Sequence, residues 1–104
     1  MAQFDVYTNP NPETNRPIPY LLDVQADLLN NLATRVVIPL YSVSAMGKAA
    51  KHLNPQFSIK RTIVILSTAE LAGVTLNSLG DKVCSLKEHR NEIIAALDFL
   101  ITGY

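Results

Sequence analysis

Short runs of alternating apolar and polar residues, separated by turn-forming residues, make up most of the chain before its C-terminal segment. In QFDVYT (3–8), Phe4 and Val6 alternate with polar neighbours. In YLLDVQA (20–26), every second residue from Tyr20 onward is apolar. A period of two is typical of strands with one buried face, so both segments are predicted to be half-buried strands.

Prolines interrupt this pattern in two places. NPNPETNRPIP (9–19) contains four prolines, which lack the N–H donor and fix φ, so this segment is predicted to be an exposed, semi-stiff loop that does not pair. RVVIPL (35–40) is apolar almost throughout and predicts a buried strand. Pro39 within it requires a sheet edge or a bulge.

Two further segments complete the predicted sheet. FSIKRTIVILS (57–67) predicts two strands around a Lys60–Arg61 turn, although that turn lacks the Asn or Gly that tight hairpins favour. GVTLNSLG (73–80) predicts a last strand, and residues 41–55 show no clear pattern. Five or more short strands with one terminal helix indicate a mainly β fold, a small antiparallel sheet or barrel with a helix packed across it.

The C-terminal segment SLKEHRNEIIAALDFLITGY predicts a helix of unusual composition. Ser85 and Glu88 have the spacing of a capping box, in which the Ser85 hydroxyl accepts the N–H of Glu88. One face carries apolar residues throughout, namely Leu86, Ile93, Leu97 and Leu100. The opposite face begins with Glu88 and Glu92 but continues as Ala95, Phe99 and Thr102, so the polar face runs out before the helix ends.

This apolar helix end has two explanations. It completes the core of its own chain, or it is buried against a second copy at a two-fold axis and continues outward to a partner. Periodicity alone does not separate an intramolecular from an intermolecular partner.

Composition limits the class of protein. The 104 residues, 48% apolar and 17% charged, predict one folded domain over 1–104 rather than a disordered chain. No segment has the ~18 uninterrupted apolar residues of a membrane span, and MAQFDVYT does not resemble a signal peptide, so a cytoplasmic location is predicted. The single cysteine, Cys84, has no disulfide partner and is predicted to be a small buried thiol.

Charge and chemistry point away from direct nucleic-acid binding and from catalysis. Nine basic residues balance nine acidic ones, and the basic residues are scattered. His52 and His89 have no partner at metal-ligand spacing, so no metal site and no cofactor are predicted. Asp23 and Asp27 are placed on a strand and a turn, where structural roles are favoured. The chain is therefore predicted to be a binding protein, not an enzyme.

Several segments carry a resemblance to a known family. MAQFDVYT, LLDVQADLL, RVVIPL and the final HRNEII…TGY resemble the CcdB family of bacterial toxins over nearly the whole chain. This resemblance implies a CcdB/MazF-like toxin fold, with an SH3-like barrel or sheet and a C-terminal helix, assembled as a homodimer. It further implies a toxin that binds the A subunit of DNA gyrase, traps the gyrase–DNA cleavage complex and is neutralised by a CcdA-like antitoxin, as in plasmid maintenance.

The resemblance also implies where gyrase is contacted. The matching positions follow the DVQAD segment and close the helix; they are Leu28, Leu29, Asp98, Ile101, Thr102, Gly103 and Tyr104. The best-known toxin of the family ends in Trp-Gly-Ile, whereas this chain ends in Thr-Gly-Tyr and so lacks the tryptophan. Buried aromatic residues often dominate binding energy, so Tyr104 is a candidate replacement anchor. The proline-rich loop differs from the family too, which affects the choice of antitoxin.

Two alternatives to gyrase poisoning follow. The MazF and Kid toxins resemble CcdB in fold but cleave RNA, although no cluster of acid, base and phosphate-binding Arg can be picked out in this sequence. The missing tryptophan also leaves open a decayed toxin that is a non-toxic structural dimer.

Overall fold

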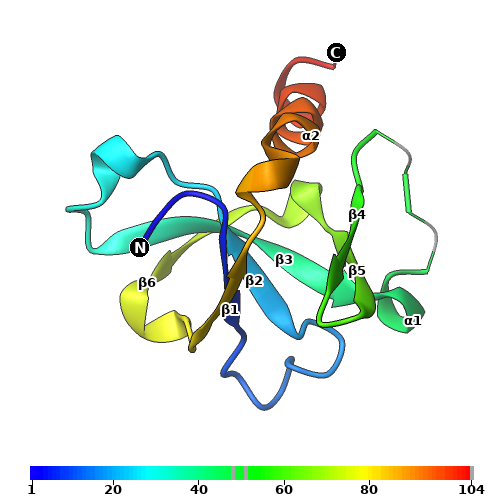
Figure 1. Cartoon of the computed structure of the whole chain (residues 1–104), viewed down its shortest axis with the longest axis horizontal. Helices are drawn as coiled ribbons and strands as arrows, with labels where there is room; N and C mark the ends of the chain where they lie inside the picture. Colours follow the sequence, from blue (N-terminus) through cyan, green and yellow to red (C-terminus); the bar gives the residue numbers. More distant parts are fainter. Residues whose placement is uncertain (48, 51, 104) are drawn as a thin grey trace.

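A curled antiparallel sheet with one helix packed across it forms the body of the protein (Figure 1). A computed structural model describes residues 1–47, 49–50 and 52–103. The strands are β1 (Asp5–Thr8), β2 (Tyr20–Asp23), β3 (Thr34–Ser42), β4 (Gln56–Ile59), β5 (Thr62–Leu66), β6 (Ala72–Thr75) and β7 (Lys82–Ser85). The helices are α1 (Val43–Met46) and α2 (Arg90–Thr102), with 3-10 turns η1 (Asp27–Leu29), η2 (Thr68–Glu70), η3 (Leu76–Ser78) and η4 (Lys87–His89). The predicted mainly β class with a C-terminal helix is confirmed.

The long strand β3 organises the sheet. The strand order is β4-β5-β3-β2-β1-β7, and β6 also pairs with β3. Along one side of β3, β6 pairs with Thr34–Val37 and β5 pairs with Leu40–Ser42. One strand therefore supports two neighbours on the same side, and this arrangement bends the sheet.

Pro39 lies in the interior of β3 and pairs with Leu21 of β2 in a regular register, so the predicted edge or bulge is wrong. The Pro39 carbonyl accepts the N–H of Ser67, which follows β5, so the Pro39 nitrogen faces the same side of the strand. That side is where the partner of β3 changes from β6 to β5. The Ser67 carbonyl, which lies opposite the Pro39 nitrogen, accepts the N–H of Glu70 instead, so the missing N–H leaves no acceptor unsatisfied there.

β1 and the second half of the YLLDVQA segment are buried on both faces, which corrects the prediction of half-buried strands there. Asp5 and Tyr7 in β1 are as buried as Val6 between them. Asp23 and Gln25, on the predicted polar side of the second segment, are buried too. The reason is that buried partners satisfy these polar groups; Asp23, for example, is paired with the buried Arg35.

The hairpin between β4 and β5 is confirmed, and its turn has an unusual composition. Lys60 and Arg61 have φ of 50° and 66°, the left-handed conformation of a type I′ turn. Residues with a Cβ are strained in this region by roughly 1–2 kcal/mol each.

We therefore expect the double variant Lys60→Asn, Arg61→Gly to be more stable than the wild type. The free energy of unfolding should rise by about 1–2 kcal/mol, because Asn and Gly adopt positive φ more readily. Thermal denaturation measures this, and the control Lys60→Gln, Arg61→Gln removes both charges without relieving the strain. An equal melting temperature for the two double variants would contradict the strain argument.

The start of the terminal helix differs from the prediction. The Ser85 hydroxyl accepts the N–H of Lys87 rather than that of Glu88, so the predicted capping box is not formed. Ser85 instead ends β7, a strand that the sequence pattern did not reveal, and η4 precedes α2. β7 forms because β1 pairs with it; Val6 lies opposite Cys84, for example.

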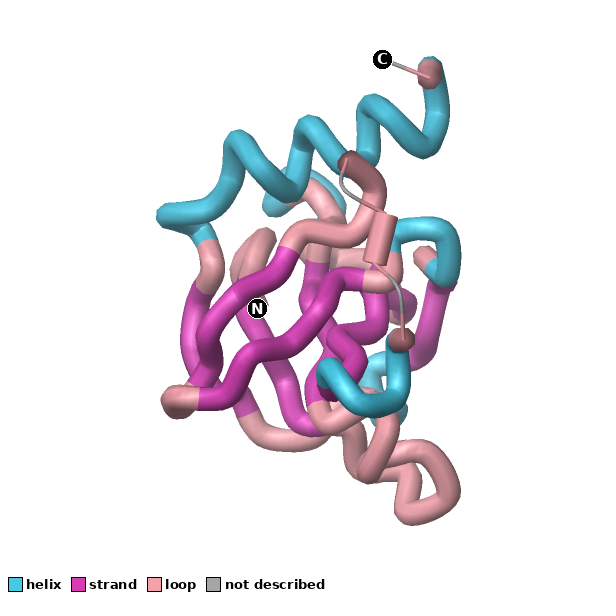
Figure 2. The backbone as a smooth tube through the Cα atoms, turned by 90° about the vertical axis from the view of Figure 1, so that its right-hand side faces the viewer, coloured by secondary structure: helices cyan, strands magenta, loops and turns pink. Residues whose placement is uncertain are grey.

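The core lies between the curled sheet and the first half of α2. Its buried residues are Phe4, Val6, Leu22, Val24, Ile38, Leu40, Phe57, Ile59, Val64, Leu66, Leu86 and Ile93. Figure 2 shows α2 lying across one end of the strands, with its last turn rising away from them. Among the described residues, no helix is long and apolar enough to cross a membrane.

Candidate functional site

The second half of α2 projects from the body of the protein. Ile93 and Ala96 are the buried residues of this helix, at 0% and 1% exposure. Beyond them, Phe99 and Leu100 are 37% exposed and Ile101 is 78% exposed. The apolar helix end therefore does not complete the core of its own chain, and its exposed apolar side chains form a candidate interaction surface.

The helix terminates as its glycine predicts. Gly103 has a φ of 80° and donates its N–H to the carbonyl of Phe99, which is a left-handed C-cap. A Cβ at Gly103 would meet no atom within 4 Å. The hydroxyl of Thr102 donates to the carbonyl of Asp98 at 2.6 Å, and both residues are exposed. The predicted contact Tyr104 lies outside the described residues.

A cavity of about 240 Å³ adjoins this helix end. It is lined by His52, Ala95, Phe99 and Gly103. The rings of His52 and Phe99 are tilted with their centroids 5.7 Å apart. A partner that covers Phe99 would therefore meet a concave surface with one aromatic wall. We define the helix-end surface as Asp98, Phe99, Leu100, Ile101, Thr102 and Gly103.

The other predicted contacts lie on η1. Leu28 is 95% exposed and Leu29 is 48% exposed. In Figure 1, η1 and the end of α2 form two separate projections. No residue of η1 lines the cavity at the helix end. The second cavity, described below, is lined by residues of neither projection. The predicted site thus consists of two apolar surfaces on one molecule.

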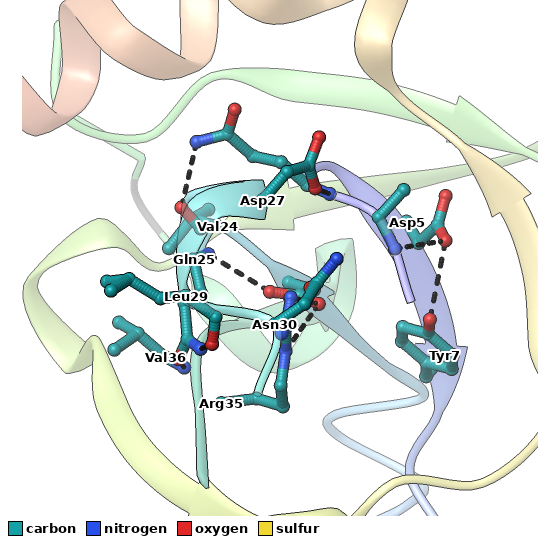
Figure 3. A network of polar contacts seen from close by, with 12 residues as sticks. Asp5, Tyr7, Val24, Gln25, Asp27, Leu29, Asn30, Arg35 and Val36 are labelled. Atoms are coloured by element: carbon teal, nitrogen blue, oxygen red, sulfur yellow. Dashed lines mark hydrogen bonds and ion pairs between the residues drawn. The ribbon is translucent and has the colours of Figure 1, made fainter. Parts of the chain in front are cut away.

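A buried polar network lies beneath η1 (Figure 3). Nε and Nη2 of Arg35 donate to Oδ2 of Asp23 at 2.9 and 2.6 Å, and both side chains are at most 1% exposed. Burial raises the pKa of the Asp23 carboxyl, whereas its bonds from Arg35 and from the N–H of Gln25 oppose that rise. Asp27 accepts the N–H of Gln3. Asp23 and Asp27 therefore have the structural roles predicted for them.

Tyr7 and Asp5 form a second buried polar group. The Tyr7 hydroxyl donates to Oδ2 of Asp5 at 3.3 Å, and Lys82 Nζ lies 3.4 Å from Oδ1 of Asp5. Burial, followed by the negative charge of Asp5, raises the pKa of Tyr7 to about 12.

This pKa predicts a loss of stability in alkali. Because the folded-state pKa is raised above the ordinary value of 10.0, the contribution of Tyr7 is complete below pH 10.0 and is lost as the pH rises through about 12. The free energy of unfolding of the wild type should fall faster than that of Tyr7→Phe over this range. Denaturant unfolding at each pH, with tyrosinate absorbance alongside, measures the difference. Parallel curves for the two proteins would refute the assignment to Tyr7.

A second cavity, of about 400 Å³, was not anticipated from the sequence. It lies between the proline-rich loop and the end of β6, and its lining is Asn9, Pro10, Asn11, Thr14, Ile18, Leu21, Pro39, Val74, Asn77 and Ser78. This set of described residues contains no charged side chain. In the sequence, the prolines and asparagines of this loop indicate turns, and no periodic pattern indicates a cavity.

The titratable candidates remain dispersed. Nδ1 of His89 lies 3.2 Å from Oε1 of Glu92 at the exposed start of α2, and the ring of His89 packs against Phe57. Cys84 is half-buried, and burial raises the pKa of its thiol. No group of three or more His, Cys, Asp or Glu residues able to hold a metal ion occurs among the described residues.

Comparison with solved structures identifies the fold. An endoribonuclease in complex with its cognate antitoxin, from Mycobacterial species, matches with a TM-score of 0.76 at 14% identity, covering 97% of this chain and 94% of the other. A second endoribonuclease from Mycobacterial species matches with a TM-score of 0.69, also at 14% identity, over 97% and 90% of the two chains. The predicted CcdB/MazF-like toxin fold is confirmed.

These structures contradict the prediction that this protein is not an enzyme. These two structures with the same fold are described as endoribonucleases, so the absence of a recognisable catalytic motif in the sequence does not exclude catalysis. At 14% identity the likeness extends to the fold and no further.

The sequence comparison is more specific. Residues 3–103 match the sequence profile of the family described as CcdB protein. The match spans nearly the whole chain, from β1 to the glycine that caps α2. The chain belongs to the CcdB family of toxins from toxin–antitoxin systems.

Proposed function

We propose that this toxin binds the A subunit of DNA gyrase and traps the gyrase–DNA cleavage complex. The observation that carries the proposal is the exposed apolar end of α2, which continues past the part of the helix that packs on the body. Membership in the CcdB family supports gyrase as the proposed target, and the helix-end surface offers a physical means of binding it.

The helix-end surface has the properties of an interface anchor. Phe99, Leu100 and Ile101 offer apolar area that folding leaves in water, so covering it contributes binding free energy. The open space around Gly103 allows another backbone to approach closely. Leu28 and Leu29 on η1 are proposed as a second contact with the same partner.

A CcdA-like antitoxin is the second proposed partner. One structural neighbour is described as an endoribonuclease in complex with its cognate antitoxin, which supports an antitoxin for this fold. The proline-rich loop differs in sequence from the best-known toxin, so we expect a cognate antitoxin specific to this chain.

We expect the protein to be a homodimer. A second copy would bury apolar surface that the single chain leaves exposed, and closed two-fold dimers are the commonest assembly of this kind. Sedimentation equilibrium at micromolar concentration should return twice the chain mass of 11.4 kDa. A mass of one chain at that concentration would contradict the dimer.

An endoribonuclease is the competing function, because two structures of this fold are described as endoribonucleases. One experiment separates the two functions. Purified protein is incubated with gyrase and supercoiled plasmid and, in parallel, with RNA. Linear DNA that appears after detergent and protease treatment indicates gyrase poisoning, whereas RNA fragments indicate a nuclease. Neither product would indicate a structural dimer without toxic activity.

A further inference from the structure

The 3-10 turn η1 has no buried side chain of its own to hold it against the body. None of its three residues is buried, and no side chain caps its N-terminus at Ala26. Leu28 is 95% exposed, so it makes almost no contact with its own chain. Apolar packing therefore does not fix this turn, and its order must come from other interactions.

Polar side chains tie η1 to the body at three successive points (Figure 3). At its start, Oδ1 of Asp27 accepts the N–H of Gln3 at 2.8 Å. At its end, the carbonyl of Leu29 accepts from Nε2 of Gln25 at 2.8 Å. Directly after it, Oδ1 of Asn30 accepts from Nη1 of Arg35 at 2.7 Å.

The groups that hold η1 are themselves fixed. Oε1 of Gln25 accepts the N–H of Val36 in β3, and the Gln25 side chain is nearly buried. Arg35 is 1% exposed and bonded to Asp23 through two nitrogens. The ties from Gln25 and Arg35 therefore connect the exposed turn to β3, since Arg35 lies in that strand and Gln25 is bonded to it. Such support keeps a binding loop in one geometry.

We infer that Asp27 and Asn30 are positioning residues that hold Leu28 and Leu29 in the conformation that contacts the partner. This inference rests on the proposed gyrase-binding function. A turn held in advance loses less conformational freedom on binding, so the same leucines bind more tightly than they would on a mobile loop. Asp27 and Asn30 thereby become determinants of affinity. They act by ordering the turn and not by offering apolar surface to the partner.

The test removes the two ties that lie on the surface. Asp27→Ala, Asn30→Ala deletes both acceptors, while the buried Gln25 and Arg35 stay in place, so folding is preserved. Asp27→Asn, Asn30→Asp is the conservative variant, since it keeps an acceptor oxygen at each position and leaves the net charge unchanged. Asn9→Ala, Asn11→Ala is the matched control, because it removes side-chain hydrogen bonds within the proline-rich loop and none to η1.

Two measurements are made on the full-length protein. Amide hydrogen exchange of residues 27–32 reports the order of η1, and titration with the isolated gyrase A-subunit fragment reports affinity. The alanine pair should accelerate exchange selectively in 27–32 and weaken binding by about tenfold, the effect of losing two ordinary hydrogen bonds. The conservative pair should restore both properties to within about threefold of the wild type, and the control should bind like the wild type.

Unchanged exchange in 27–32 would overturn the positioning role, because the ties would then not hold η1. Faster exchange with unchanged affinity would overturn it as well, because the order of η1 would not matter for binding. If the wild type does not bind the gyrase fragment, the proposed function fails; the exchange measurement still decides whether Asp27 and Asn30 order the turn.

Discussion

Arg35→Met is expected to destabilise the protein more than any surface substitution. It removes the guanidinium and leaves the Asp23 carboxylate buried at 0% exposure without its ionic partner. Breaking a buried pair in this way costs about 3–5 kcal/mol of the free energy of unfolding. For a domain of this size the melting temperature should fall by about 10 °C or more.

The same variant has a predictable dependence on pH. Burial already raises the pKa of Asp23, and Arg35 is one of the groups that oppose that rise. Without Arg35 the folded-state pKa rises further above the unfolded value, so the folded state takes up a proton over a wider range of pH. The stability deficit relative to the wild type should therefore shrink as the pH falls. Denaturant unfolding across the acidic range measures it.

The control for this prediction is the double variant Arg35→Met, Asp23→Leu. It removes both charges, and replacing a whole buried pair with apolar residues is often neutral. It should recover much of the stability lost in the single variant. A double variant that is as unstable as Arg35→Met would mean that packing of the Arg35 stem, rather than the unpaired carboxylate, causes the loss.

The second large effect is expected at the helix-end surface. Ile101→Asp places a charge where the proposed partner requires an apolar contact, and it should weaken binding to the gyrase A-subunit fragment by roughly 30-fold or more, the scale of an interface hot spot. Because Ile101 is 78% exposed, the melting temperature should change little. Growth inhibition in cells should be lost together with binding.

Leu76→Asp provides the matched control for the helix-end prediction. Leu76 lies on η3 and is 45% exposed, so this variant introduces the same charge on an apolar surface outside the proposed contact. It should bind gyrase and inhibit growth like the wild type. Full toxicity of Ile101→Asp, or an equal loss in both variants, would show that the end of α2 is not the effector surface.

Elements that depend on residues close together in the sequence were predictable from the sequence. The alternation around Lys60 and Arg61 predicted the β4–β5 hairpin, and the prolines of residues 9–19 predicted an unpaired loop. The left-handed end of α2 is likewise a local matter, because the conformational freedom of Gly103 is a property of the residue itself. The family resemblance, carried by contiguous motifs, was confirmed over residues 3–103.

The features that depend on distant partners were not predictable in the same way. β7 exists because β1 pairs with it from the other end of the chain, and Ser85 consequently ends a strand instead of capping a helix. Pro39 is tolerated in a central strand because two different strands meet opposite it. Asp23 and Arg35 are separated by 12 positions in the sequence, and their pairing buries Asp23 on the face of the second strand that was predicted to be polar.

The sequence by itself determined the class of fold, the family and the apolar character of the last helical turns, since each of these is encoded in local periodicity or in contiguous motifs. Only the tertiary structure decided that those turns leave the body rather than enter its core, because the exposure of Phe99 and Ile101 depends on where the sheet ends beneath α2. It also decided that η1 is held by polar ties, because Gln3, Gln25 and Arg35 reach the turn only after three strands have paired. Hydrogen bonds between distant side chains leave no periodic trace in a sequence, whereas burial of a strand or helix face does.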